Sequence, residues 1–156
     1  MEQASTPLPI YVGIKLTDEC AAKIEHYTHL MLGDKIPAEC FVPQREYHIT
    51  MLYAPDGTID NVIPYNPYSI AFPNVSVGTA WALAHMNNGT IAVIIISKFL
   101  RKLHKQFYAV SKSRLRFSGF VPHVTIATDV PKIPYLQKFI NIPIVLNFLY
   151  AEPLNK

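Results

Sequence analysis

Residues 46–53 read EYHITMLY and residues 120–127 read FVPHVTIA, and these two stretches decide the fold. Each carries a His-x-Thr triplet inside a short apolar run, which is typical of a β-strand. Successive side chains of a strand point to opposite faces, so His48 shares a face with Thr50, and His123 shares a face with Thr125. The aliphatic side chains between and after them point to the other face, toward a core.

The first stretch closes a strand, helix, strand unit. Ile10–Leu16 is a β-rich apolar run, and Thr17 then offers a hydroxyl N-cap followed by Asp18 and Glu19, which favours a helix start. An apolar stripe at helical spacing predicts that this helix continues to a stop at Gly33. The stripe consists of Cys20, Ile24, Tyr27 and Met31.

The same order of elements recurs later in the chain. Thr90–Ile96 predicts a second strand, Ser97 a second hydroxyl N-cap, and residues 121–127 a second closing strand. The two caps are 80 residues apart and the two histidines are 75 apart, which predicts a duplicated module with a pseudo-twofold relation. The helical stripe of this unit consists of Leu100, Leu103, Phe107 and Val110.

Four further segments complete the expected fold. Tyr68–Val77 and Thr79–His85 predict strands, 131–140 a short helix, and 142–150 a last strand, while proline clusters that include Pro143 indicate loops and edge strands. We therefore expect one α+β domain over residues 1–156. Its two pseudosymmetric lobes, each an antiparallel sheet backed by helices, face one another across a central cleft.

Composition places the chain among soluble globular proteins. Half of its 156 residues are hydrophobic, and no apolar run approaches the roughly 20 residues that span a bilayer. Residues 1–9 lack the basic start and apolar core of a secretory signal, so we expect a cytoplasmic protein with no membrane partner. Cys20 and Cys40 are then expected to be reduced thiols.

Charge is divided unevenly along the chain. Residues 1–60 carry four basic and nine acidic side chains, whereas residues 61–128 carry seven basic and no acidic ones. A positive half suits a phosphate-bearing ligand through long-range attraction. A solvated basic helix face explains the same pattern.

Two histidines on matching strands suit phosphoryl transfer. Imidazole titrates near pH 6.5, so one ring can accept the proton of an attacking oxygen while the other protonates the leaving oxygen, without a metal or other cofactor. Threonine hydroxyls on the same face can donate to the nonbridging oxygens. Taken singly, each histidine has an ordinary structural explanation, and it is the repeated setting that favours His48, Thr50, His123 and Thr125 as catalytic residues.

Other chemistries find little support in the sequence. His26 and His29 lie three residues apart on the first predicted helix, but no HExxH motif or Cys/His cluster accompanies them, so we expect no metal site. Walker loops, dinucleotide-binding glycine motifs and G-x-S-x-G elbows are absent.

The pair of hydrophobic-flanked His-x-Thr motifs resembles the signature of the 2H phosphoesterase superfamily, which includes LigT-like enzymes. The layout resembles that superfamily over nearly the whole chain. Residues 11–16, residues 120–125 and the short tail near Glu152 are similar to the phage anti-CBASS branch, whose members cleave 3'-5' linkages of cyclic di- and trinucleotides. That resemblance implies base contacts from Tyr11, Trp81 and Glu152, although core or edge packing also explains the two aromatic residues.

The resemblance leaves three functions open. The first is a metal-independent phosphodiesterase acting on cyclic oligonucleotides, with either a ribose 2'-hydroxyl or water as the attacking group. The second is RNA-end processing, as a 2',3'-cyclic phosphodiesterase or a 2'-5' RNA ligase-type enzyme. The third is a noncatalytic nucleotide sponge, for which the basic half and the aromatic residues suffice. We expect a small nucleotide substrate in each case and no stable nucleic-acid partner.

Overall fold

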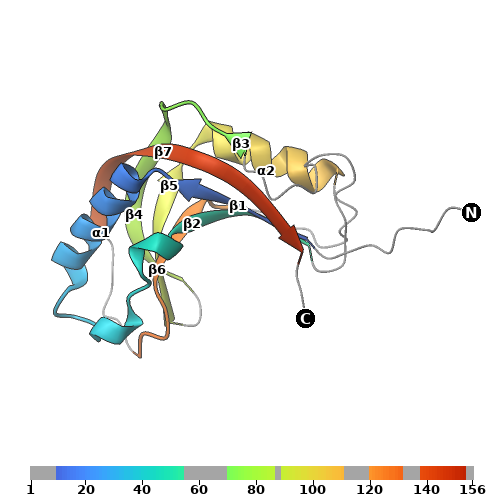
Figure 1. The fold of residues 1–156 in the computed structure, drawn as a ribbon. Helices are drawn as coiled ribbons and strands as arrows, with labels where there is room; N and C mark the ends of the chain where they lie inside the picture. Colours follow the sequence, from blue (N-terminus) through green and yellow to red (C-terminus); the bar gives the residue numbers. More distant parts are fainter. Residues whose placement is uncertain (1–9, 55–69, 87–88, 111–119, 132–137, 154–156) are drawn as a thin grey trace, which may run out of the picture.

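A computed structural model describes residues 10–54, 70–86, 89–110, 120–131 and 138–153 (Figure 1). Two helices and seven strands make up this part of the chain, with short 3-10 turns at η1 (Ala38–Cys40) and η2 (Gln44–Glu46). The elements are β1 (Ile10–Leu16), α1 (Asp18–Leu32), β2 (His48–Ala54), β3 (Ile70–Ala71), β4 (Ser76–Met86), β5 (Thr90–Ile96), α2 (Lys98–Val110), β6 (His123–Ala127) and β7 (Lys138–Pro153). The predicted α+β class is confirmed.

The strands of both units are joined in one antiparallel sheet with the order β1-β2-β6-β5-β4-β7-β3. An additional β1–β7 pairing links this order back on itself, so six strands form a closed circuit and β3 is a short addition on β7. The long curved strand β7 makes this possible, because its first part pairs with β4 and its second part with β1 (Figure 1). The two lobes therefore share a strand, and they meet again where β2 pairs with β6.

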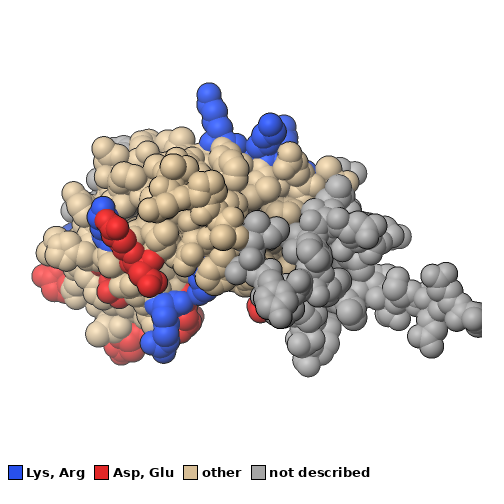
Figure 2. Space-filling model, turned by 45° about the horizontal axis from the view of Figure 1, so that its top comes forward, with Lys and Arg blue, Asp and Glu red and all other residues tan. Residues whose placement is uncertain are grey.

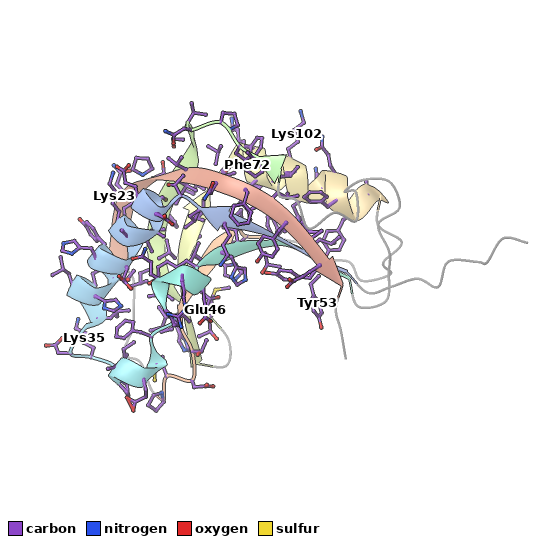
Figure 3. All side chains as sticks on the ribbon, in the orientation of Figure 1. Lys23, Lys35, Glu46, Tyr53, Phe72 and Lys102 are labelled. Carbon is purple, nitrogen blue, oxygen red and sulfur yellow. The ribbon has the colours of Figure 1, made fainter. Side chains whose placement is uncertain are left out.

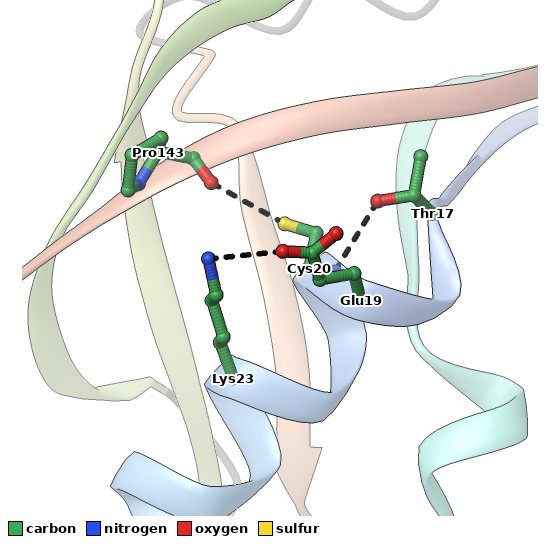
Figure 4. Close-up of polar contacts among 5 residues, drawn as sticks. All are labelled: Thr17, Glu19, Cys20, Lys23 and Pro143. Carbon is green, nitrogen blue, oxygen red and sulfur yellow. Dashed lines mark hydrogen bonds and ion pairs between the residues drawn. The ribbon is translucent and has the colours of Figure 1, made fainter. Parts of the chain in front are cut away.

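Both hydroxyl caps form as the sequence predicts. The Thr17 side chain accepts a hydrogen bond from the Cys20 backbone N–H at 3.2 Å, as Figure 4 shows, and the Ser97 hydroxyl accepts one from the Leu100 N–H at 3.0 Å. Each cap satisfies one of the amide groups that a helix leaves unpaired in its first turn. The strands Ile10–Leu16 and Thr90–Ile96 that precede the caps are also confirmed.

The buried stripe of α1 differs from the predicted one. Tyr27 is 44% exposed, and the helix instead buries Thr28 and Leu32 below Cys20 and Ile24. Thr28 tolerates burial because its hydroxyl donates to the Ile24 carbonyl at 2.8 Å. Thr28, whose hydroxyl is hydrogen-bonded within the helix, thus takes the core position that the apolar pattern assigned to Tyr27.

The prediction of a short helix over residues 131–140 was wrong for the part of this range that the structure describes. Residues 132–137 lie outside the described part of the chain, and Lys138 already begins β7, a strand of 16 residues that includes the predicted 142–150 strand. Pro143 lies in this strand opposite Thr79, in a part that pairs only with β4 among the described residues, so it has the predicted edge-strand position. Its missing N–H is tolerated, and its carbonyl accepts a hydrogen bond from the Cys20 thiol at 3.5 Å (Figure 4).

The strands between the two units are divided differently from the prediction. Only Ile70 and Ala71 form β3, a turn follows in which the Val75 N–H donates to the Pro73 carbonyl, and β4 begins at Ser76. The predicted Thr79–His85 strand lies within β4. Tyr68 and Ser69 lie outside the described residues.

Matching β-bulges reveal the pseudosymmetry in detail. The register of β1 with β2 passes from Val12 opposite Leu52 to Gly13 opposite Thr50, which leaves Met51 as the extra residue. The register of β5 with β6 skips Ile126 in the same way, between Ala127 and Thr125. Each extra residue directly follows a His-x-Thr triplet, and bulges of this kind re-aim neighbouring side chains.

The carbonyl of each extra residue is satisfied from the other unit. The His104 ring on α2 donates from Nδ1 to the Met51 carbonyl at 2.9 Å, and the Val42 N–H donates to the Ile126 carbonyl at 2.9 Å. Because a buried carbonyl without a partner costs free energy, these two bonds hold the bulges in place. They also explain why a histidine lies in the core.

The helices cross over between the two units. Helix α2 packs against β2 and β4, and α1 packs against β7 near Pro143, in the part that pairs with β4. Phe72, which follows β3, meets Phe99 of α2 edge to face at 6.0 Å between ring centroids, and Figure 3 shows Phe72 beside that helix. Each helix thus helps to fasten its own unit to the other one.

The core is a single apolar cluster between the helices and one face of the sheet. It contains Ile24 and Leu100 from the helices together with Ile49 and Val124 from the motif strands. Cys20 and Cys40 are both buried and free, as expected for reduced thiols. Neither helix in the described part is long and apolar enough to cross a membrane.

Candidate active site

The two His-x-Thr strands present alternating faces, as the sequence predicts. Ile49 and Val124 are fully buried, and so are the bulged residues Met51 and Ile126 that follow them. The four motif side chains are half-buried on the opposite face, which the helices do not cover. These four are His48, Thr50, His123 and Thr125.

The two motif histidines are held by the same local hydrogen bond. Nδ1 of His48 lies 2.8 Å from the carbonyl oxygen of Glu46, and Nδ1 of His123 lies 2.9 Å from that of Val121, two residues earlier in each case. Since a carbonyl oxygen only accepts, Nδ1 carries the proton in both rings. Nε2 of each ring is therefore the atom left to exchange protons with a ligand.

The two motifs meet at their central residues. Ile49 is the partner of Val124 across the antiparallel β2–β6 pairing. In this register His48 lies across from Thr125, and Thr50 lies across from His123. We call this β2–β6 pairing the seam. A hollow of about 290 Å³ opens beside it, lined by Thr50 and His123 together with His104 and Tyr108 of α2, but by neither His48 nor Thr125.

Tyr11 of β1 lies directly beside the first motif. Its hydroxyl is 2.8 Å from the Thr50 hydroxyl oxygen, and its ring meets the His48 ring edge to face at 6.0 Å between centroids. Burial raises the pKa of Tyr11, so its phenol keeps its proton at neutral pH. The sequence-predicted residue is therefore in contact with both polar members of the first motif.

Glu152 lies in the same region, whereas Trp81 lies elsewhere on the sheet. Glu152 of β7 is the cross-strand partner of Tyr11 and is exposed. Trp81 lies on β4, at the register irregularity between Ala80 and Ala82, and is 46% exposed. Two pairings, β4 with β5 and β5 with β6, separate its strand from that of His123.

Three residues of this region escaped the sequence analysis. Tyr150 of β7 lies 6.1 Å from Tyr11 of β1 between ring centroids. Gly13 of β1 is the cross-strand partner of Tyr150 and lies in the space between the two tyrosine rings. Lys15 is the cross-strand partner of His48. The signal that could have found Gly13 is its presence inside an apolar strand, where glycine often marks a close approach. Nothing in the sequence shows that Tyr150 lies opposite it.

The basic side chains of α2 face away from the motif residues. Lys98, Arg101, Lys102 and Lys105 are exposed, and Figure 3 shows Lys102 pointing outward from the helix. In Figure 2, the blue side chains at the top of the view stand without red neighbours, whereas both signs mix at the opposite end of the molecule. For these four residues a solvated helix face is the better explanation, and their attraction for an anion acts only at long range.

Metal-ligating side chains do not gather in the described part of the chain. Among these residues, no three His, Cys, Asp or Glu side chains are placed to hold one ion. The His29 ring packs against the Phe41 ring at a tilt of 36°, with 4.1 Å between centroids, and His26 lines a shallow pocket beside Lys23 and Asn141. The chemistry that the motif face offers is acid and base catalysis by two imidazoles, with hydroxyls as hydrogen-bond donors.

Comparison with known families assigns nearly the whole chain. The family model described as "Anti-CBASS protein Acb1" matches residues 8–156. A curated relative, the anti-CBASS protein Acb1 of Yersinia phage phiR1-RT, is 27% identical over 148 residues, which cover 93% of this chain and 88% of the relative.

Solved structures with the same fold include Escherichia coli LigT. Its complex with 3'-AMP superposes with a TM-score of 0.57 at 14% identity, covering 96% of this chain and 97% of LigT. The complex with phosphate gives a TM-score of 0.51, also at 14% identity, and covers 97% and 96% of the two chains. At this identity the likeness shows a shared fold.

Proposed function

The chain belongs to the Acb1 family of anti-CBASS proteins, and we propose that it hydrolyses 3'-5' phosphodiester bonds of cyclic di- and trinucleotide messengers without a metal ion. Its catalytic residues are His48, Thr50, His123 and Thr125. The observation that carries this proposal is the matched pair of Nδ1 hydrogen bonds, which leaves Nε2 of each ring unbonded within its motif.

The reaction needs one proton acceptor and one proton donor at the same phosphate. Nε2 of one neutral histidine takes the proton of the attacking oxygen as that oxygen forms its bond to phosphorus. Nε2 of the other, protonated histidine gives its proton to the ribose oxygen as the old ester bond breaks. Because both rings have the same local hydrogen bond, the single orientation in which the substrate binds decides which ring has which role.

The threonines complete each half of the site. A hydroxyl on the same face as each histidine can donate to a nonbridging phosphate oxygen, where negative charge builds up in the transition state. In the β2–β6 register each threonine lies across from the histidine of the other motif. Both hydroxyls are therefore close to the seam where the phosphate would lie.

Contacts outside the motifs would hold the nucleosides. Tyr11 lies beside His48 and can contact a base or ribose attached to the phosphate, and Glu152 lies opposite Tyr11 on β7. Trp81 offers a partly exposed indole, on which a base could stack. The LigT complex with 3'-AMP shows that this fold accommodates a nucleotide in another protein.

A panel of substrates tests the proposal. The purified protein is incubated with a cyclic dinucleotide, a cyclic trinucleotide and a 2',3'-cyclic mononucleotide, with and without EDTA, and the products are separated by chromatography. We expect linear products from the cyclic oligonucleotides, formed equally fast with EDTA. Cleavage of the 2',3'-cyclic mononucleotide alone would instead assign RNA-end processing.

Recovery of the ligand separates catalysis from sequestration. After heat denaturation, a noncatalytic sponge releases its cyclic ligand unchanged, whereas a phosphodiesterase releases a linear product. Loss of activity with EDTA that is restored by added metal would contradict the two-histidine mechanism.

A further inference from the structure

The hydroxyl of Thr50 belongs to a row of side chains that crosses three strands. Gly13 of β1 is paired with Thr50 of β2 on one side and with Tyr150 of β7 on the other. Tyr11, two residues before Gly13 on the same face of β1, has its hydroxyl 2.8 Å from the Thr50 oxygen. Tyr11 therefore contacts Thr50 directly, and Tyr150 lies farther along the same row.

Gly13 is required for this arrangement. A Cβ atom at this position would lie 2.6 Å from the Tyr150 hydroxyl oxygen and 3.0 Å from the Tyr11 ring. Both distances are below an ordinary van der Waals contact, so any larger residue would push the Tyr150 phenol away. The glycine lets the Tyr150 side chain lie across β1 and reach Tyr11.

Both phenols keep their protons at neutral pH. Burial raises the pKa of Tyr150, and charge and hydrogen-bond interactions with Tyr11 raise it further. Burial also raises the pKa of Tyr11, although its hydrogen bonds with Thr50 and Tyr150 act in the opposite direction. Each tyrosine therefore has one hydrogen to donate, and an oxygen that can accept one.

We propose that Tyr150 is a positioning residue that orients the Thr50 hydroxyl through Tyr11. The Tyr150 hydroxyl donates to the Tyr11 oxygen, and the Tyr11 hydrogen is thereby directed to the Thr50 oxygen. Thr50 then has its own hydrogen free, and it donates that hydrogen to a nonbridging oxygen of the phosphate. This inference rests on the proposed phosphodiesterase activity.

The second half of the site lacks such a relay. The equivalent row runs from Ala84 of β4 through Ala92 of β5 to Thr125 of β6. Thr90, two residues before Ala92, takes the place of Tyr11, and within the described residues no hydrogen bond joins its side chain to Thr125. Alanine methyl groups cannot orient a hydroxyl. The two threonines are thus inequivalent, and Thr125 supplies a matched internal control.

A double-mutant cycle tests the relay with any cyclic dinucleotide that the wild type cleaves. Tyr150→Phe removes one hydroxyl and is expected to lower kcat about five- to tenfold, the usual effect of one neutral hydrogen bond, while KM stays nearly unchanged. In a Thr50→Val background Tyr150→Phe should cause no further loss, because the group that it orients is gone. In Thr50→Ser and Thr125→Val backgrounds the full loss should remain.

The outcomes separate this inference from the activity on which it rests. An inactive wild type would count against the proposed function. In an active enzyme, equal losses from Tyr150→Phe in the Thr50→Val and wild-type backgrounds would overturn the relay. A second cycle checks the geometry: Gly13→Ala should lower kcat and melting temperature in the wild type, and both effects should shrink in Tyr150→Ala. Undiminished effects there would show that the glycine does not make room for Tyr150.

Discussion

Ile49, the middle residue of the first His-x-Thr motif, pairs across the seam with Val124, the middle residue of the second. Both are fully buried, so the two motifs are fixed to one another through the core rather than through their polar side chains. The polar side chains of both motifs lie on the other face, partly exposed.

Replacement of either motif histidine should abolish most of the turnover. His48→Ala and His123→Ala each remove a proton-transfer group, so we expect kcat to fall by about 10²- to 10⁴-fold in either variant. The measurement is the rate of cyclic dinucleotide cleavage under single-turnover conditions, with circular dichroism to check folding. A variant that keeps the wild-type rate would remove that histidine from the mechanism.

Trp81 should contribute to substrate binding rather than to chemistry. If a base stacks on the indole, Trp81→Ala costs about 1 to 3 kcal/mol of binding and raises KM about five- to 150-fold, with a smaller effect on kcat. Tyr27→Ala is the matched control, because Tyr27 is 44% exposed on α1 and Trp81 is 46% exposed on β4. Equal KM values for the two variants would show that the indole does not contact the substrate.

The seam between the motifs should be visible in stability measurements. Ile49→Ala is expected to lower the free energy of unfolding by about 2 to 5 kcal/mol, because it leaves a cavity in the core. Together with Val124→Ala it should show a coupling of about 0.5 to 3 kcal/mol, since the two residues are paired. Urea denaturation measures both quantities, and Ile96→Ala, at a 51% exposed position, should change little. Strict additivity of the pair would contradict the seam.

His104 should make stability depend on pH. Burial lowers its pKa in the folded protein, although its hydrogen bond to the Met51 carbonyl partly offsets the effect. Between that lowered value and the ordinary value of about 6.5, the unfolded chain binds more protons, so stability is lost as the pH falls through this window. Urea denaturation between pH 7.5 and 5 measures the loss.

The variant His104→Gln provides the control for this pH dependence. Its amide can still donate to the Met51 carbonyl but does not titrate. We therefore expect a shallower loss of stability on acidification than in the wild type. Parallel curves for the two proteins would assign the pH dependence to other groups.

The sequence predicted local structure where one signal acted alone. Thr17 and Ser97 cap helices because a hydroxyl after an apolar strand has few competing uses. The predicted burial of Tyr27 was wrong because the Thr28 hydroxyl forms its hydrogen bond within the helix, so Thr28 can take the buried position. The helix expected over residues 131–140 failed because Lys138 already begins β7, a strand that both lobes share, which no local pattern reveals.

Only the site residues that belong to the repeated His-x-Thr motifs could be predicted from the sequence. Both His-x-Thr motifs stood out because strand alternation and the 75-residue repeat agree on them. Tyr150 did not, because its role depends on the β1–β7 register and on the missing Cβ of Gly13, neither of which the sequence displays. The partner of His104 is a carbonyl that a bulge frees on a distant strand, which no local pattern displays.

The most direct test of two-histidine catalysis uses a cyclic dinucleotide in which sulfur replaces the 5'-bridging oxygen of each linkage. A thiolate leaves without being protonated, so the variant that lacks the general acid should regain activity and the one that lacks the base should not. We expect one of His48→Ala and His123→Ala to be rescued by about 100-fold or more relative to the oxygen substrate. Rescue of both variants, or of neither, would contradict it.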